Sequence, residues 1–170
     1  MDSTKANPQT TTQKRIPAKP SALRKVSSDS VEIVFLDKQA AIEELKECAE
    51  RLTSEDQRVA AVGLFGSLAR GDATAFSDAD ILIVLRSHPD SPWFRRIPEY
   101  QEAFIGTSLS VEPFPYVLDE IHNMLNQVGL MRTAVRELIP LAGDVQLFDR
   151  LKERLSGNET QVERNAWNPH

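Results

Sequence analysis

Residues 63–84 read Gly-Leu-Phe-Gly-Ser-Leu-Ala-Arg-Gly-Asp-Ala-Thr-Ala-Phe-Ser-Asp-Ala-Asp-Ile-Leu-Ile-Val, and this stretch decides the fold. It completes one apolar run at 59–65 and leads into a second at 81–85. Both runs are continuous and contain β-branched residues, which predicts two strands buried on both faces. A Gly-Ser pair ends the first run, and residues 67–70 are expected to open a short helix. The two strands therefore form the centre of a sheet.

The residues between these strands suit a phosphorylated ligand. Gly66 lets the backbone approach a ligand closely, and Ser67 adds a hydroxyl donor to the N–H groups at the start of a helix, an arrangement that binds phosphate. Asp78 and Asp80 point to one face of the second strand because side chains alternate along a strand. Two carboxylates on one face favour Mg²⁺, which takes one or two carboxylates together with waters and phosphate oxygens.

A site of this kind calls for a third carboxylate, and Glu112 is the best candidate. It lies in the apolar stretch 111–116, where packing gives no reason for an acid. Three carboxylates can hold two metal ions that activate an attacking hydroxyl and stabilise a leaving pyrophosphate. Simpler interpretations stay open at this point. Glu112 could be an exposed acid of an edge strand, and Asp78 and Asp80 a solvated strand entry after an ordinary turn.

Hydrophobic periodicity predicts the remaining elements. They are a strand over 31–36, a helix over 37–52, a helix over 93–105 that Pro98 kinks or splits, a strand over 109–114, and helices over 117–139 and 145–155. The prolines of the 109–114 strand place it at an edge or end it there. This order indicates an α/β (α+β) fold with a small mixed β-sheet of at least three strands and flanking helices.

Five further side chains have plainer interpretations. Cys48 lies on the apolar stripe of its helix and is expected to be a buried, inert thiol. His88, His122 and His170 show neither metal-ligand spacing nor a partner nucleophile, so we expect them on the surface. Arg70 could reach a phosphate, but pairing with a local carboxylate explains it equally well.

Length and composition predict one globular domain, since the chain has 170 residues of which 41% are hydrophobic. Residues 1–30, rich in Ser, Thr, Lys and Pro, are expected to be a disordered basic tail, residues 31–160 the domain, and residues 161–170 a frayed end. The apolar runs are far shorter than the roughly 20 residues that span a bilayer, which argues against a membrane. A single cysteine and the lack of an apolar leader favour the cytoplasm.

The charge is unevenly distributed. Residues 1–30 carry six basic and two acidic side chains, a net charge of +4, which leaves −9 on residues 31–170 out of −5 overall. Affinity for nucleic acid comes largely from neutralising phosphates with Lys and Arg. An acidic domain is therefore not expected to bind nucleic acid.

The central stretch resembles the nucleotidyltransferases of the DNA polymerase beta superfamily, whose signature is Gly-Ser, a ten-residue spacer and Asp-x-Asp. Gly66-Ser67, residues 68–77 and Asp78-Ala79-Asp80 match it without a gap. Ala69-Arg70-Gly71 after the serine and Ser77 before the first aspartate are similar to the minimal nucleotidyltransferases, the small branch of this superfamily. Residues 111–116 resemble the third strand of that branch, which implies that Glu112 is the third catalytic carboxylate.

The resemblance implies transfer of AMP from ATP to an acceptor hydroxyl with release of pyrophosphate. It assigns Asp78, Asp80 and Glu112 to catalysis and to two Mg²⁺ ions, and Gly66 and Ser67 to the nucleotide. Minimal nucleotidyltransferases often pair with a small helical HEPN toxin as the antitoxin and adenylylate one of its tyrosines. With 58 residues after Glu112, we expect a macromolecular acceptor of this kind. A small-molecule acceptor such as an aminoglycoside and a non-catalytic partner-binding module stay open as alternatives.

Overall fold

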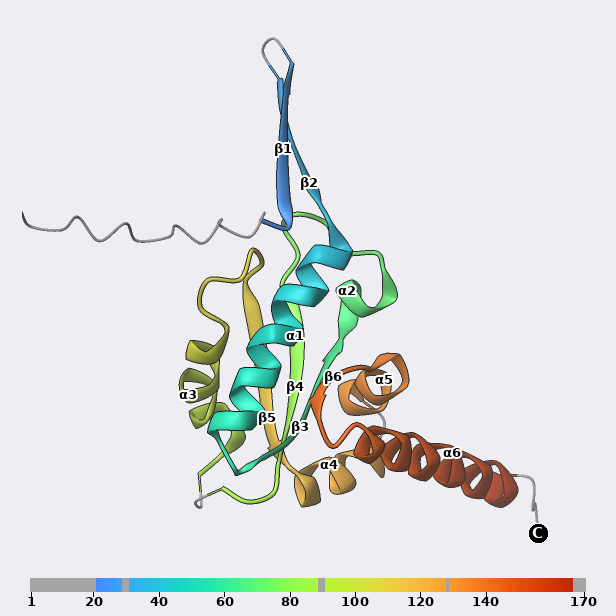
Figure 1. Ribbon diagram of the computed structural model, residues 1–170. Coiled ribbons are helices and arrows are strands. Elements are labelled where there is room, and N and C mark those ends of the chain that lie inside the picture. The colour runs from blue at the N-terminus through green and yellow to red at the C-terminus, as the bar shows by residue number, and fades with distance from the viewer. Residues whose placement is uncertain (1–20, 29–30, 89–90, 128, 167–170) are drawn as a thin grey trace, which may run out of the picture.

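The computed structural model describes residues 21–28, 31–88, 91–127 and 129–166. Figure 1 shows a sheet flanked by helices, with a hairpin projecting from one end. The elements in chain order are β1 (Leu23–Ser28), β2 (Val31–Leu36), α1 (Lys38–Glu55), β3 (Val59–Phe65), α2 (Gly66–Arg70), β4 (Ala79–Leu85), η1 (Trp93–Arg95), α3 (Ile97–Gln101), η2 (Glu102–Phe104), β5 (Val111–Val117), α4 (Leu118–Leu125), α5 (Leu130–Glu137), β6 (Ile139–Gly143) and α6 (Gln146–Ala166).

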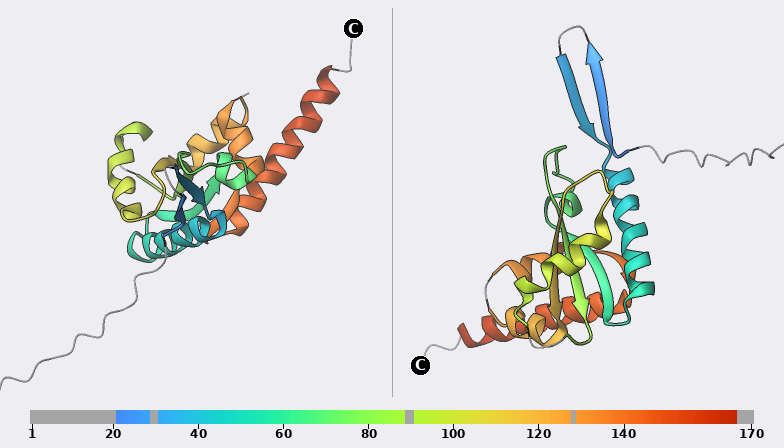
Figure 2. Two further views of the ribbon diagram at one scale, coloured as in Figure 1. Left: turned by 90° about the horizontal axis from the view of Figure 1, so that it is seen from above. Right: turned by 90° about the vertical axis from the view of Figure 1, so that its left-hand side faces the viewer.

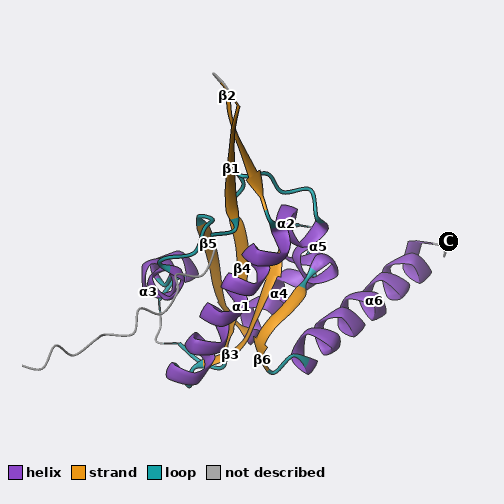
Figure 3. Cartoon of the chain, turned by 45° about the horizontal axis from the view of Figure 1, so that its top comes forward, coloured by secondary structure: helices purple, strands orange, loops and turns teal. Residues whose placement is uncertain are grey.

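The main sheet has four strands in the order β5-β4-β3-β6, which Figure 3 shows side by side. β3 runs antiparallel to β4 and β6, and β4 runs parallel to β5. The carboxyl end of β3 and the amino ends of β4 and β5 therefore meet at one end of the strands. We call each end of the strands an edge of the sheet, as distinct from the edge strands β5 and β6. The expected small mixed sheet with flanking helices is confirmed.

Both faces of the sheet are covered, which explains why β3 is apolar throughout. α1 and the segment from α3 to η2 cover one face, where Leu45, Val62, Ile83 and Tyr100 share a core. α4, α5 and α6 cover the other face, where Phe65, Leu82, Ile121 and Phe148 form a second core. Figure 2 shows α1 and α5 on opposite sides of the strands.

Most predicted elements are found near their expected bounds. α1 begins where Asp37 caps it, since the Asp37 carboxylate accepts a hydrogen bond of 3.1 Å from the Ala40 N–H. Cys48 is buried on its inner face, as expected. The expected helix over 93–105 is split into η1, α3 and η2, and Pro98 lies in the first turn of α3, where its missing N–H does no harm.

Two predictions on the carboxyl half are wrong. The single helix expected over 117–139 is two helices, because the chain turns at Gly129 between α4 and α5. The segment 139–143, expected only to separate helices, is the fourth strand β6. Pro140 is tolerated there because β6 is an edge strand, where a missing N–H need not break the ladder.

The strand β5 also runs farther than the expected 109–114. Its two prolines, Pro113 and Pro115, are two residues apart and therefore turn the same way in the strand. β5 is an edge strand, as predicted, so both missing N–H groups can face the open side while the residues between them pair with β4. The prolines thus mark the edge without ending the strand.

The segment Leu23–Ser28 was expected to belong to a disordered tail, and this is wrong. It forms β1, which pairs antiparallel with β2 as a separate two-stranded hairpin. Its composition is poor in apolar residues, but the neighbouring strand supplies the hydrogen-bonding partner. Residues 1–20 of the expected tail lie outside the described residues.

α6 continues to Ala166, past residue 160, where fraying was expected, and residues 167–170 lie outside the described part. None of the helices within the described ranges has both the length and the apolar character needed to cross a membrane.

Candidate active site

One edge of the sheet brings together most of the predicted site residues. Phe65, the last residue of β3, pairs with Asp80 in β4, and Asp80 pairs with Glu112 in β5. Gly66 follows Phe65 directly and begins α2. Asp80 and Glu112 therefore stand side by side on neighbouring parallel strands, next to the turn from β3 into α2.

Gly66 is required here for two reasons. Its φ of +73° lies in the left-handed region that side chains other than hydrogen disfavour. A Cβ at this position would also overlap Oδ2 of Asp80. The Gly-Ser turn and the carboxylate of Asp80 are thus packed against each other, so a larger residue at position 66 would displace this carboxylate.

The electrostatics of Asp80 show that the acidic side chains are crowded. Burial raises the pKa of the Asp80 carboxyl, and the negative charges of Glu112 and Asp78 raise it further. The nearby guanidinium of Arg70 opposes this shift. Crowded carboxylates with a raised pKa are a common feature of functional sites, because a cation or phosphate-bound metal later neutralises them.

These side chains line an open cleft of about 500 Å³ between the strand ends and α5. The lining residues are Phe65, Gly66, Ser67, Arg70, Asp80, Glu112, Phe114, Leu130, Thr133 and Glu137. Four of the five predicted site residues are therefore in one cleft. Asp78 is not among the lining residues; it is exposed just before β4 and acts on Asp80 through its charge.

Glu137 and Thr133 of α5 were missed by the sequence analysis. Glu137 accepts an ion pair of 2.8 Å from Arg70, which also contacts Asp72 at 3.3 Å, so Arg70 pairs with a local carboxylate as one interpretation expected. An acid in the last turn of a helix opposes the helix dipole. That unfavourable position was the available signal for Glu137, because the expected helix over 117–139 also has this residue in its last turn.

Within the described ranges, no three His, Cys, Asp or Glu side chains are already arranged to hold a metal ion. The three-carboxylate metal site thus stays a prediction. The donor set nevertheless fits a magnesium ion, because Asp80 and Glu112 are adjacent carboxylates beside a turn that suits phosphate. Mg²⁺ completes its coordination with waters and substrate phosphates and needs no preformed protein cage.

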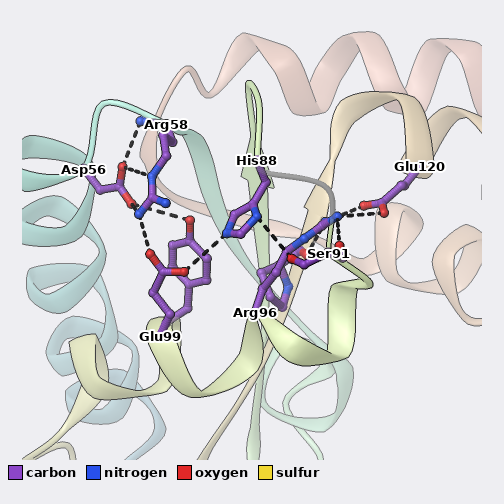
Figure 4. A network of polar contacts seen from close by, with 9 residues as sticks. Asp56, Arg58, His88, Ser91, Arg96, Glu99 and Glu120 are labelled. Carbon is purple, nitrogen blue, oxygen red and sulfur yellow. Dashed lines mark hydrogen bonds and ion pairs between the residues drawn. The ribbon is translucent and has the colours of Figure 1, made fainter.

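The opposite edge of the sheet carries a network of ion pairs, shown in Figure 4, which we call the brace. Its members are Asp56, Arg58, His88, Ser91, Arg96, Glu99 and Glu120. Arg58 contacts Asp56 at 2.7 Å and Glu99 at 2.5 Å, and His88 lies 3.3 Å from Glu99. The His88 side chain is only 8% exposed, so the expectation that it is a surface residue is wrong.

The second half of the brace is centred on Arg96, which is buried. Its guanidinium donates to both carboxylate oxygens of Glu120, at 2.7 and 3.1 Å, and to the Ser91 carbonyl at 2.6 Å. Glu120 also accepts from the Val117 N–H at 2.9 Å, which ties the end of β5 to the start of α4. The brace thus joins the loops at the edge opposite the cleft.

The cleft has the features of a site for phosphoryl chemistry, and comparison with known proteins agrees. The chain is similar to the protein adenylyltransferase MntA of Thermococcus cleftensis, with 31% identity over 78 residues that cover 46% of this chain and 70% of that protein. Residues 42–156 match the nucleotidyltransferase domain. The protein belongs to this family and is an enzyme, a nucleotidyltransferase.

Solved structures also resemble the chain. One is a toxin–antitoxin structure with AMP-PNP, with a TM-score of 0.47 and 18% identity over 74% of this chain and 93% of the other. Another is a tri-AMPylated Shewanella oneidensis HEPN toxin in complex with an MNT antitoxin, with a TM-score of 0.45 and 17% identity over 76% of this chain and 93% of the other.

Proposed function

We propose that this nucleotidyltransferase transfers AMP from ATP to a hydroxyl group of a partner protein and depends on Mg²⁺. The observation that carries the proposal is the register of β4 and β5, which puts the carboxylates of Asp80 and Glu112 next to each other beside Gly66. A phosphate-binding turn and paired carboxylates in one cleft are what nucleotidyl transfer needs.

Each residue has a role that follows from its place. Ser67 and the backbone at Gly66 would bind the triphosphate at the start of α2, and Asp80 and Glu112, together with Asp78 just before β4, would hold Mg²⁺. The metal supplies neutralising charge for the phosphates when it is bound. Glu112 takes the proton of the acceptor hydroxyl as its oxygen bonds to the α-phosphorus. The bond between the α-phosphorus and the bridging oxygen breaks, and pyrophosphate leaves.

A protein acceptor is supported by the similarity to MntA, which is a protein adenylyltransferase. The resemblance to minimal nucleotidyltransferases further supports a tyrosine of a small helical HEPN toxin, which the protein would neutralise as its antitoxin in the cytoplasm. The solved MNT antitoxin was found in complex with an AMPylated HEPN toxin. We extend that partner class to this chain as part of the proposal.

The test is incubation with α-labelled ATP, Mg²⁺ and the protein encoded in the neighbouring reading frame, followed by mass spectrometry of both chains. We expect AMP on a tyrosine of the neighbour, and no transfer by the double variant Asp78→Asn with Asp80→Asn. Asp149→Asn, an exposed aspartate of α6, is the matched control and should transfer normally. Undiminished transfer by the double variant would refute the site.

The other acceptor classes are outcomes of the same experiment. Transfer to an added aminoglycoside but not to protein would replace the proposed acceptor with a small molecule. Neutralisation of the neighbour without transfer, equal for the wild type and the double variant, would indicate a binding module.

A further inference from the structure

An apolar cavity of about 170 Å³ adjoins the carboxylate cleft. It lies between one face of the sheet, where β3 and β5 line it, and the helices α4 and α5. Its walls include Phe65, Phe114, Tyr116, Met124, Met131 and Ala134. Phe65, Phe114 and Leu130 line both the cavity and the cleft. A ligand can therefore have one part in the acidic cleft and another in the apolar cavity.

The aromatic side chains that line the cavity pack against one another and against Trp93. The rings of Phe65 and Phe114 lie 5.2 Å apart at an angle of 60°. Trp93 stacks on Phe114 with the planes 17° apart and contacts the ring of Tyr116 at 5.1 Å. Rings packed in this way keep their positions and offer a fixed surface to a planar ligand.

The opposite wall is adaptable. Met124 and Met131 are unbranched thioethers that adjust their shape to a bound ring. Leu130 at the shared boundary is 59% exposed, and Gln127 contributes an amide that can both donate and accept hydrogen bonds. A concave, mostly apolar space with a few polar groups at its rim is typical of small-molecule sites, so the cavity is a candidate for a ligand.

We propose that this cavity binds the nucleobase of the nucleotide whose phosphates occupy the cleft. The inference rests on the proposed function and extends it to the part of the substrate that the sequence motif does not contact. A nucleoside triphosphate is charged at one end and aromatic at the other, as are the two adjoining spaces. An apolar cavity of about 150 Å³ takes up one benzene ring, and the open side of this cavity leaves room for the second ring of a purine.

The base would pack against Phe65 and Phe114, with its polar edge toward Gln127. Stacking of a base on an aromatic side chain accounts for roughly 5- to 150-fold in affinity. The cavity then decides how tightly the nucleotide binds, whereas the carboxylates decide whether it reacts.

The experiment compares two ligands by calorimetry on the full chain with Mg²⁺ present. ATP carries the base, and inorganic tripolyphosphate carries only the phosphates. We expect the wild type to bind ATP at least about five-fold more tightly than tripolyphosphate. Ala134→Leu, which fills the cavity, should remove most of this preference and leave the affinity for tripolyphosphate within about two-fold.

A second variant tests the inference at an exposed residue, because a substitution of the buried Ala134 can also disturb the fold. Gln127→Ala changes an exposed side chain at the cavity and should lower the affinity for ATP but not that for tripolyphosphate. Gln146→Ala in α6 is its matched control. Equal affinities of the wild type for the two ligands would overturn the inference, as would equal losses of both in the variants. So would unchanged ATP binding with impaired transfer, because the cavity would then hold the acceptor. A wild type that binds neither ligand would overturn the proposed function itself.

Discussion

The two edges of the main sheet shift the pKa values of their carboxyl groups in opposite directions. At the brace, hydrogen bonds from Arg58 lower the pKa of Asp56 and of Glu99, so these carboxylates stabilise the fold in their charged forms. At the cleft, burial and the neighbouring acids raise the pKa of Asp80, so its charge is unfavourable in the free protein. The brace pairs Asp56 and Glu99 with Arg58, whereas at the cleft Asp80 lies among like charges, which our proposal assigns to metal and nucleotide binding.

The largest effect is expected from breaking the brace at Glu120. Glu120→Ala leaves the guanidinium of Arg96, which is 5% exposed, without its carboxylate. Leaving a buried charged group without its partner costs about 2 kcal/mol or more, although Glu120 is itself 34% exposed. The carbonyls of Ser91 and Pro115 also still accept hydrogen bonds from Arg96. Chemical denaturation measures the loss.

The neighbouring Asp119 provides the control, because it is exposed in the same helical turn. Asp119→Ala should change the free energy of unfolding by about 0.5 kcal/mol at most. A loss below about 1 kcal/mol for Glu120→Ala would mean that the brace adds little, and the contrast between the edges would lose its energetic meaning.

At the cleft, removal of a charge should raise the free energy of unfolding, whereas at the brace it lowers it. Asp80→Asn abolishes AMP transfer in our proposal, yet it should raise the free energy of unfolding at pH 7 by about 1 kcal/mol, because it removes repulsion from Glu112 and Asp78. Asp78→Asn is the comparison, since Asp78 is exposed and should gain less. A destabilised Asp80→Asn protein would show that this carboxylate is structurally required.

Much of the cleft edge was predictable from local sequence. The apolar runs at 59–65 and 81–85 predicted two central strands, and the spacing from Gly66 to Asp80 indicated the site. In the structure Gly66 and Asp80 are in van der Waals reach of each other. Patterns that follow from neighbouring residues or from one strand pair can be recognised in a sequence.

The features that were missed depend on contacts between distant segments. β6 consists of five residues, among them Pro140, and becomes a strand only because β3 offers its open side. Glu137 enters the cleft only because α5 packs there. His88 is covered because α3 brings Glu99 to it, and nothing in the residues around position 88 indicates that.

The two edges should also respond differently to acid. The lowered pKa of Asp56 means that its contribution is present above pH 4 or so and is lost as the pH falls through the lowered value. The cost of Asp56→Asn should therefore be largest at pH 7 and vanish in acid. Asp80 has a raised pKa, so the gain from Asp80→Asn should also be largest at pH 7 and decline as wild-type Asp80 becomes protonated.

Urea denaturation of both variants between pH 7 and pH 3.5 measures these differences. We expect the two curves of ΔΔG against pH to start with opposite signs. The curve of Asp80→Asn should decline toward zero within this range because the pKa of Asp80 is raised above 3.8, whereas that of Asp56→Asn should only begin to decline at about pH 4 because the pKa of Asp56 lies below 3.8. Curves that stay flat would show that neither edge owes its behaviour to these carboxylates.

The hairpin β1–β2 gives the smallest expected effect and shows how far the cleft edge extends. It is attached at that edge, because the Ala22 N–H donates to Ser108 Oγ at 2.8 Å, just before β5, and Lys38, which follows the hairpin, contacts the Gly71 carbonyl beside α2. The hairpin projects from there into solvent (Figures 1 and 2). Ile33 and Phe35 lie on one of its faces and are about half exposed, at 48% and 51%.

Ile33→Thr keeps a β-branched side chain in the strand and Phe35→Thr introduces one, and both remove apolar groups that are about half exposed. Each should therefore change the free energy of unfolding by no more than about 0.5 kcal/mol. Leu36→Ala is the matched control, since Leu36 packs on the core and should cost about 1 kcal/mol or more. If the exposed face proved as costly as Leu36, the hairpin would belong with the brace as a stabilising element. Neutral substitutions would show that this exposed face of the hairpin contributes little to the stability of the fold.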